Sequence, residues 1–316
     1  MGVKGALYLR IPSGHKHTAM RAAISELSKM VPTLKYEEGS RKSAYTFDPK
    51  DFAAVREALG GMALSTTAAK LLKDFFAQLA KHELALAEDN LKYFDTDKIG
   101  GFKPGRKLFH KQKQAMAWLE SRGHSGVIAL DTGLGKTATA IASMQKMIRD
   151  GLLQDGQQFL YVCPPALRGN LPKEIEAFIE DPKALRDRVR VMSYTEFQKS
   201  VASDPDFASR YAAVLFDEAQ ALKNPGSGTA SAAMRLNHPR KILLTASPME
   251  KSPLEVFTLV AISNNLDLNT KEGRAQLRAF RARFCEEVGG KIIGIKNDPT
   301  TARDFRVWVK QNLYFA

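Results

Sequence analysis

Five short apolar runs recur through the middle of the chain, and each is rich in β-branched or aromatic residues. Segments with apolar residues at helical spacing lie between them, including 137–149, 172–180 and 228–236. Strands alternating with amphipathic helices are typical of an α/β fold in which helices flank both faces of a central parallel sheet. The predicted strands are GVIAL (126–130), FLYVC (159–163), VRVMS (189–193), AAVLF (212–216) and KILLT (241–245).

The first hundred residues have a different pattern, which predicts a small α+β accessory domain over 1–95 before an α/β domain over 96–316. Asp, Lys and Gly with little periodicity make 89–107 a predicted linker. The predicted elements are a strand at 6–12, a helix near 18–30, a strand–turn–strand unit about Gly39 at 34–47, a helix at 51–61 and a longer helix at 65–88.

Charge is unevenly distributed along the 316 residues, whose formal net charge is +13. Segment 101–125 carries 6 Lys+Arg against 1 Asp+Glu, and 271–316 carries 10 against 5, whereas 126–270 is neutral with 16 of each. Basic segments beside a neutral middle indicate a polyanionic partner. Two cysteines, no signal-peptide core and no apolar run of about 20 residues favour a reducing compartment without a membrane, hence a cytoplasmic protein.

The segment DTGLGKT (131–137) joins a predicted strand to a predicted helix. Gly133 and Gly135 allow backbone N–H groups to turn toward a phosphate, and Lys136 extends from the start of the helix to the β- and γ-phosphates of ATP. The Thr137 hydroxyl is the expected ligand for Mg²⁺. The alternative is an ordinary glycine turn, since position 130 is Leu where the general phosphate-loop pattern has glycine.

An acidic pair, Asp217 and Glu218, follows the strand AAVLF about 80 residues after this loop. Asp217 is the expected carboxylate for Mg²⁺, and Glu218 is placed to orient or deprotonate an attacking water. Helix capping is the alternative for such a pair considered alone. Thr245 and Ser247 end the fifth strand, where ligands of an open parallel sheet gather; their alternative is a cap on the next helix, which SPLEVF (252–257) also explains.

These motifs, in this order, resemble the first RecA-like motor lobe of superfamily 2 helicases, most closely the Swi/Snf-type DNA translocases. LFHKQKQAMAWL (108–119) is similar to the adenine-recognising segment, with Gln112 at the position that reads the base and Lys111 where the family usually has an aromatic residue. The resemblance implies ATP and Mg²⁺ as cofactors, catalysis by Lys136, Asp217 and Glu218, and Gln220 as a polar contact between the γ-phosphate and TASP (245–248).

The resemblance also implies contacts with the DNA backbone. VCPPALRGNLPKEIEAF (162–178) is similar to a segment that meets DNA phosphates, SYTEF (193–197) to the next DNA-facing segment, and FDEAQALKNP (216–225) to the acidic box with its Lys-Asn continuation. In the family the third motif, with Thr245 and Ser247, links the state of ATP to the DNA-binding surface. The residues expected at DNA are Arg168, Asn170, Ser193, Tyr194, Lys223 and Asn224.

Two further regions are expected to face DNA. Arginines at near-helical spacing in RAQLRAFRARF (274–284) predict either a phosphate track or a solvated helix face opposite Leu277, Phe280 and Phe284. LKYEEGSRKSAYTFDPKDFAAVREAL (34–59) loosely resembles the substrate-recognition (HARP) domain of annealing helicases, and the alternative is a structural cap. Since no base-reading motif is evident, we expect contacts independent of DNA sequence.

The sequence therefore predicts an ATP-dependent helicase or translocase on double-stranded or forked DNA, nucleoid-associated or nuclear according to the organism. The alternatives are the motor of a restriction or anti-restriction enzyme and a non-hydrolysing DNA-binding scaffold. The motif-bearing second RecA-like lobe is expected in the rest of a longer chain or in a partner, because nothing after residue 270 resembles it. Since an arginine finger contributes roughly 10³–10⁵ in rate, residues 1–316 alone are expected to bind ATP weakly and hydrolyse it inefficiently.

Overall fold

The computed structural model describes residues 7–9, 35–37, 44–47, 88–289 and 291–315. The chain divides into two compact units, Met1–Glu83 and Leu84–Ala316. This division precedes the predicted boundary after residue 95. Each unit is therefore described by itself, and the roles predicted for the two domains stay predictions.

The described part of the first unit is a three-stranded antiparallel sheet with the order β1-β3-β2. Strands β2 and β3 pair with Tyr36 opposite Tyr45, which confirms the two strands of the predicted strand–turn–strand unit, while its turn about Gly39 lies outside the described residues. The predicted helices at 18–30 and 51–61, and nearly all of the one at 65–88, lie outside the described residues. The bounds are β1 Leu7–Leu9, β2 Lys35–Glu37 and β3 Ala44–Phe47.

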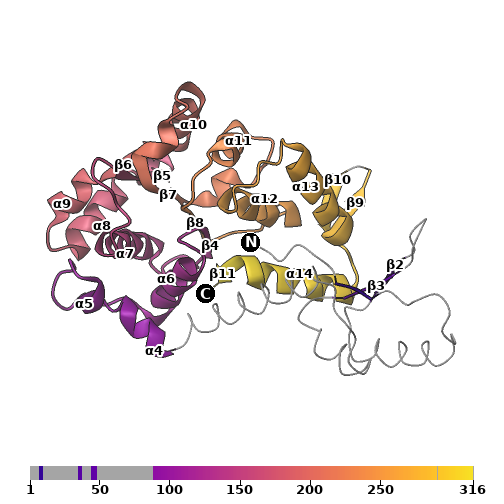
Figure 1. The fold of residues 1–316 in the computed structure, drawn as a ribbon, viewed down its shortest axis with the longest axis horizontal. Helices are drawn as coiled ribbons and strands as arrows, with labels where there is room; N and C mark the ends of the chain where they lie inside the picture. The colour runs from indigo at the N-terminus through magenta and orange to yellow at the C-terminus, as the bar shows by residue number, and fades with distance from the viewer. Residues whose placement is uncertain (1–6, 10–34, 38–43, 48–87, 290, 316) are drawn as a thin grey trace. The chain divides into compact units, whose positions relative to one another are not determined.

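The second unit is built on a six-stranded parallel sheet with the order β11-β4-β8-β7-β5-β6 (Figure 1). All five strands expected from the apolar runs are present within a residue or two of their predicted ends, so the α/β fold with a central parallel sheet is confirmed. Their bounds are β4 Gly126–Ala129, β5 Gln158–Cys163, β6 Val189–Ser193, β7 Tyr211–Asp217 and β8 Lys241–Thr245.

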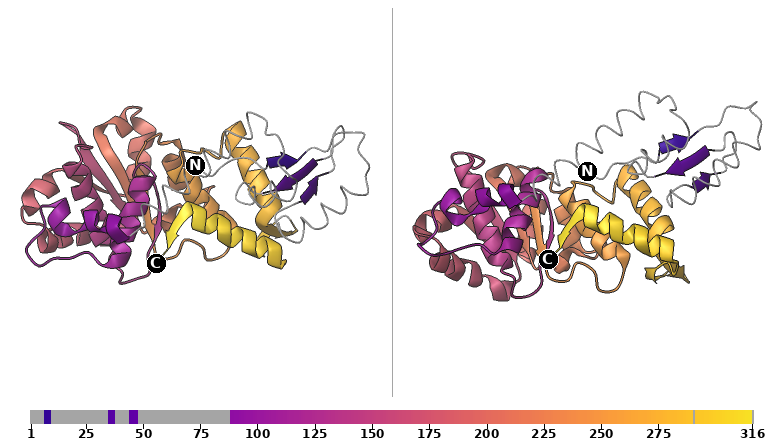
Figure 2. Two further views of the ribbon diagram at one scale, coloured as in Figure 1. Left: turned by 60° about the horizontal axis from the view of Figure 1, so that its bottom comes forward. Right: turned by 90° about the horizontal axis from the view of Figure 1, so that it is seen from below.

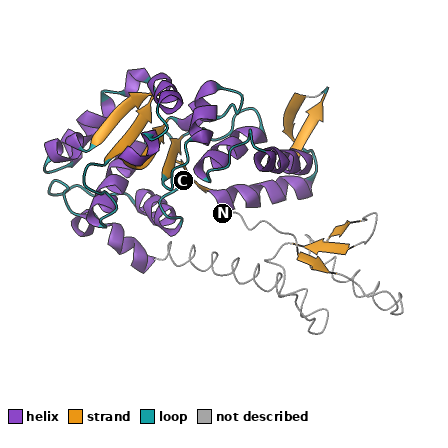
Figure 3. Ribbon diagram, turned by 45° about the horizontal axis from the view of Figure 1, so that its top comes forward, coloured by secondary structure: helices purple, strands orange, loops and turns teal. Residues whose placement is uncertain are grey.

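Helices cover both faces of the sheet (Figure 3). Alternate residues of the strands enter two separate cores, one on each face. Ile128, Leu215 and Leu244 face α6 (His110–Ser121), α7 (Lys136–Arg149), α8 (Asn170–Phe178) and α9 (Pro182–Asp187). Val127, Val214 and Leu243 lie in the other core. The helices of that core are α10 Tyr194–Ser203, α11 Gly228–Arg235, α12 Pro253–Ser263, α13 Lys271–Phe284 and α14 Pro299–Asn312.

Segment 89–107 is not a bare linker, and that prediction is wrong. It contains α4 (Glu88–Leu91), the 3₁₀ turn η2 (Lys92–Phe94) and α5 (Thr96–Ile99). Leu91, Phe94, Ile99 and Phe102 are buried in the same core as α6 and α7. Elements of three or four residues are too short to show a helical period in the sequence. Their apolar side chains become buried because α6 and α7 provide the surface against which they pack.

The C-terminal region adds an antiparallel hairpin, β9 (Cys285–Val288) with β10 (Lys291–Ile295), and then α14. The chain next enters β11 (Leu313–Phe315), the sixth strand, which pairs in parallel with β4 at the edge of the sheet (Figure 2). The apolar pattern had not predicted β11, which is three residues long. Among the described residues, no helix is long and apolar enough to cross a membrane.

Candidate nucleotide-binding site

The phosphate loop connects the buried strand β4 to α7. Gly133 and Gly135 have φ angles of +89° and +77°, in the left-handed region that favours glycine. Gly135 is the N-cap of α7, and Lys136 is its first residue. The first N–H groups of this 14-residue helix have no partner within the helix, an arrangement suited to an anion, and the contact of this loop with a phosphate stays a prediction.

Gln112, in the segment 108–119 predicted to recognise adenine, contacts this loop. Its side chain is 3 % exposed; Oε1 accepts from the backbone N–H of Phe109 at 2.9 Å, and Nε2 donates to the carbonyl of Leu134 at 3.0 Å. A Cβ at Gly135 would lie 2.3 Å from the Gln112 amide nitrogen. Glycine at 135 is thus required by both its backbone angle and this close approach, and the contact of Gln112 with a base stays a prediction.

The acidic pair stands at the end of β7, beside the phosphate loop. Glu218 has φ of +50°, a left-handed conformation that is uncommon for a residue with a side chain and that redirects the chain after the strand. Its Oε1 lies 3.9 Å from Nζ of Lys136. The structure thus brings together two of the three predicted catalytic residues, from elements about 80 positions apart.

Asp217, the third of these residues, is 6 % exposed and accepts the backbone N–H of Glu218 on Oδ1 at 3.0 Å. Burial raises the pKa of its carboxyl above the ordinary value, and the neighbouring Glu218 adds to the rise. The nearby Tyr161 hydroxyl, the bond from the Glu218 N–H and the charge of Lys136 act in the opposite direction. Asp217 therefore does not act as a helix cap, since its side chain is directed into the site.

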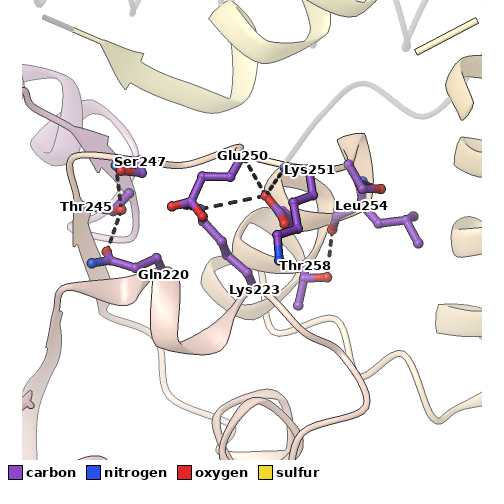
Figure 4. Close-up of polar contacts among 10 residues, drawn as sticks. Gln220, Lys223, Thr245, Ser247, Glu250, Lys251, Leu254 and Thr258 are labelled. Atoms are coloured by element: carbon purple, nitrogen blue, oxygen red, sulfur yellow. Dashed lines mark hydrogen bonds and ion pairs between the residues drawn. The ribbon is translucent and has the colours of Figure 1, made fainter. Parts of the chain in front are cut away.

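A hydrogen-bonded chain leads from the acidic pair to the end of β8, and Figure 4 shows its part from Gln220 to Ser247. Nε2 of Gln220 donates to Oε2 of Glu218 at 2.8 Å, and the hydroxyl of Thr245 donates to Oε1 of Gln220 at 2.9 Å. The Thr245 oxygen in turn accepts the N–H of Ser247 at 3.1 Å. The cap of α12 is Ser252, whose Oγ accepts from Leu254. Thr245 and Ser247 therefore do not cap that helix, and Thr245 contacts the acidic-box segment.

The sequence matches the SNF2-related domain over residues 110–210 and 184–272, together more than half of the chain. The chain belongs to the SNF2-related family. This confirms the resemblance of the second unit to the first motor lobe of Swi/Snf-type proteins.

Several curated relatives align with this SNF2-related chain. A probable global transactivator of Orgyia pseudotsugata multicapsid polyhedrosis virus is 27 % identical over 48 % of this chain and 34 % of its own length. The chromatin-remodeling ATPase INO80 of Aspergillus oryzae is 25 % identical over 68 % of this chain and 17 % of its own length. The chain thus spans about a third of the first of these relatives and less than a fifth of the second. The Sulfolobus solfataricus SWI2/SNF2 ATPase core in complex with dsDNA aligns with a TM-score of 0.49 and 21 % identity, over 67 % of this chain and 44 % of that one.

The residues of this SNF2-related lobe that were expected at DNA divide into exposed and internal ones. Asn170 is exposed at the start of α8. Arg168 is ion-paired with Glu196, while its buried Nε has no hydrogen-bond partner. Ser193 caps α10, where its Oγ accepts the N–H of Glu196 at 3.2 Å. Arg168 and Ser193 are therefore connected through Glu196, which the sequence reading had not singled out.

Tyr194 and Lys223 are buried inside the lobe, whereas Asn224 is exposed. Tyr194 is buried and donates its hydroxyl to the carbonyl of Asp217 at 2.8 Å. The Asn224 side chain stabilises the turn that follows it, because its Oδ1 accepts the backbone N–H of Gly226 at 2.9 Å. In this conformation Tyr194 presents no hydroxyl to an outside phosphate, and its predicted DNA contact stays a prediction.

Lys223 is 7 % exposed, and its ammonium lies 3.0 Å from Glu250 and 3.7 Å from Glu255 (Figure 4). Glu255 also accepts the backbone N–H groups of Glu250 and Lys251 at 2.5 and 3.1 Å. Lys223 therefore binds the segment after the acidic box to the segment between β8 and α12. Sequence reasoning missed this ion pair because its carboxylates lie about 30 residues away along the chain.

The predicted arginine track on α13 has mostly internal partners. Arg281 makes a bidentate pair with Glu287 at 3.0 Å, Arg283 contacts Asp304 at 3.3 Å, and Arg274 donates to the carbonyl of Asn269. Phe280 and Phe284 are buried, as expected for the opposite, apolar face. The helix therefore has the features of the structural alternative that the sequence left open.

A divalent cation would find few protein ligands here. Among the described residues, no three His, Cys, Asp or Glu side chains form a group that could hold a metal ion. Mg²⁺ typically binds one or two protein oxygen ligands together with phosphate oxygens and water. The Thr137 hydroxyl and Asp217 carboxylate, both within reach of the Tyr161 hydroxyl, are chemically suited to that mode.

Proposed function

We propose that this chain comprises the N-terminal domain and first motor lobe of an ATP-dependent DNA translocase of the Swi/Snf type. The observation that carries the proposal is the pairing of Lys136 with Glu218, 3.9 Å apart, beside the buried Asp217. A lysine at a phosphate loop facing an acidic pair is the arrangement that nucleotide hydrolysis requires. Membership of the SNF2-related family supports the same conclusion.

Each group of the site has a role in this proposal. The α7 N-terminus and Lys136 would bind the phosphates of ATP, and Thr137 and Asp217 would hold Mg²⁺, whose charge would stabilise the transferred phosphoryl group. Glu218 orients the attacking water and accepts its proton. Gln220 relays the state of Glu218 to Thr245 through the two hydrogen bonds described above.

Efficient turnover is proposed to need an arginine from a second RecA-like lobe, in the rest of the protein or in a partner. Among the described residues, no hydrogen bond or ion pair brings an arginine to Lys136 or Glu218. Closure of the two lobes on ATP and reopening after hydrolysis would move the protein along DNA.

DNA is the proposed track, contacted through its backbone. Exposed Asn170, Arg168 and the basic segment 101–125 are the proposed contacts, with Lys107 and Lys111 exposed in that segment. Such contacts carry no base specificity and weaken steeply with salt. The first unit is proposed to help select the DNA substrate, and a DNA partner implies a nucleoid or nuclear site of action.

Substitution of the phosphate-loop lysine tests nucleotide binding directly. Lys136→Ala should weaken binding of a fluorescent ATP analogue by about 10–100-fold, because a charge-assisted contact with phosphate is lost. Lys183→Ala, which removes an exposed lysine from α9, is the matched control and should bind as the wild type does. Equal affinities of the two variants would contradict the proposed function.

A further inference from the structure

Strand β5 carries one hydroxyl in an otherwise apolar run, that of Tyr161. The residue is 1 % exposed and lies in the core shared with α7. A buried hydroxyl without a partner costs free energy that phenylalanine at the same position would avoid. The partners of this hydroxyl therefore indicate what it does.

The strand register directs Tyr161 toward the predicted metal ligands. Tyr161 pairs with Leu215 on β7, and both face the α7 side of the sheet. Asp217 follows Leu215 by two residues and so shares that face, at the end of the strand. Thr137 is the second residue of α7, the helix that covers the same face. A tyrosine side chain extends far enough to reach both.

The Tyr161 hydroxyl interacts with both of these groups. The Asp217 carboxylate and the Thr137 hydroxyl lie close enough to the Tyr161 phenol to shift its pKa, in opposite directions. The backbone of Asp217 is held independently, because Tyr194 donates to its carbonyl at 2.8 Å. Asp217 thus lies between two tyrosines, one from each core: Tyr194 binds its carbonyl, and Tyr161 lies on the same face of the sheet as its carboxylate.

We propose that Tyr161 is a positioning residue of the Mg²⁺ site, whose hydroxyl orients the Asp217 carboxylate and the Thr137 hydroxyl for a divalent cation. This inference rests on the proposed function, since it concerns the same site. Groups that orient a metal ligand typically contribute about 10–100-fold to metal affinity.

The test uses residues 1–316, mant-ADP as the nucleotide and MgCl₂ as the metal. Tyr161→Phe keeps the ring and removes the hydroxyl. It should raise the Mg²⁺ concentration that half-saturates the fluorescence change by about 10–100-fold, while affinity for mant-ADP without metal stays at the wild-type value. Tyr211→Phe is the matched control, since Tyr211 is buried at the opposite end of β7 from Asp217. This variant should require the wild-type Mg²⁺ concentration.

Two outcomes would overturn the inference while leaving the proposed function intact. One is a Mg²⁺ requirement of Tyr161→Phe equal to that of Tyr211→Phe. The other is equal weakening of mant-ADP binding with and without metal, which would make Tyr161 a support of the fold alone. If wild-type protein binds mant-ADP with no response to Mg²⁺, both the inference and the proposed metal site fail.

A second set of variants tests whether Tyr161 acts through Asp217. Asp217→Asn should weaken Mg²⁺ binding, and adding Tyr161→Phe to it should weaken binding little further, because the oriented carboxylate is already absent. If the two substitutions lowered Mg²⁺ affinity in a fully additive way, Tyr161 would not act through Asp217. Thermal unfolding of each variant without metal checks its folding. If Tyr161→Phe does not fold, Tyr161→Met, which fills similar space without a hydroxyl, must show the same selective loss of Mg²⁺ affinity.

Discussion

Thr245, the last residue of β8, donates its hydroxyl to Oε1 of Gln220 at 2.9 Å, and the other end of that amide donates to Glu218. Glu218 is thereby connected in two steps to the segment that precedes α12, and Figure 4 shows the second step, from Gln220 to Thr245. Because each group in this chain is buried or half-buried, loss of one partner leaves the next without a bond.

Thr245→Val removes this connection without changing the shape of the side chain. We expect the free energy of unfolding to fall by about 1–3 kcal/mol, since the oxygen of Gln220 and the N–H of Ser247 both lose their partner. In the full-length protein, ATP should still bind, but DNA should stimulate its hydrolysis less. Chemical denaturation and DNA-stimulated turnover measure the two effects.

Thr258→Val is the control for that change. Thr258 is equally buried, on α12, and its hydroxyl only adds a bond to the carbonyl of Leu254 within the helix. Its removal should leave DNA stimulation unchanged. If DNA stimulates ATP hydrolysis equally in both variants, the hydrogen bond between Gln220 and Thr245 does not couple DNA binding to hydrolysis.

Glu218→Gln separates binding from chemistry. The amide fills the same space but cannot accept a proton from water, so turnover by the full-length protein should fall by at least about 10²–10⁴-fold. Binding of a fluorescent ATP analogue should be preserved, because Lys136 and the α7 N-terminus remain. Unchanged turnover would show that Glu218 is not the base.

Lys223→Met decides between a structural and a DNA-binding role for this lysine. Its loss leaves the nearly buried carboxylate of Glu255 without its cation, so the midpoint of thermal unfolding should fall by at least about 2–4 °C. DNA affinity should change no more than in Lys251→Met, which removes an exposed lysine from the adjacent segment. A loss of DNA affinity specific to Lys223→Met would restore the sequence-based expectation.

The sheet was predictable because its strands are buried on both faces. The apolar run of β7 predicted a buried strand, and Asp217 and Glu218 directly after it predicted where the candidate carboxylates lie. β11 gave no such signal, because three residues at the sheet edge are recognisable as a strand only once β4 is beside them. The buried turns around Phe94 escaped prediction for the same reason, since their burial depends on distant helices.

Within the site, the sequence predicted which residues gather but not how they are bonded. The phosphate loop and acidic pair follow from spacing along the chain. The internal partners of Lys223 and Tyr194 do not, because a lysine or tyrosine in a family motif is equally suited to phosphate and to a nearby carboxylate or carbonyl. Only the folded structure shows which of these groups lies next to Lys223 and Tyr194.

The phosphate loop offers a matched pair of glycine substitutions. Gly133→Ala and Gly135→Ala both place a side chain at positive φ, which costs about 1–2 kcal/mol. A Cβ at 133 has nothing within 4 Å, whereas one at 135 displaces the Gln112 amide. We expect Gly135→Ala to destabilise the protein more in chemical denaturation, and equal losses would contradict the close packing of Gln112.

Lys241 gives a prediction for pH dependence. Its side chain is fully buried at the start of β8, where Nζ donates to the carbonyls of Ala233 and Leu236 at the end of α11. Burial lowers the pKa of this ammonium to about 7, although the carboxylate of Asp267 acts in the opposite direction. The unfolded chain therefore retains this proton over a pH range in which the folded chain has lost it.

The free energy of unfolding contributed by Lys241 should accordingly rise with pH between about 7 and 10.5, by at most about 1.4 kcal/mol per pH unit. Lys241→Met removes the titrating group but also its two bonds to carbonyls. Urea unfolding of both proteins at pH 7, 8 and 9 should show the wild type gaining stability relative to the variant at each step. A difference that stays constant across these pH values would mean that Lys241 keeps its charge in the folded protein, held by the carbonyl groups at the end of α11.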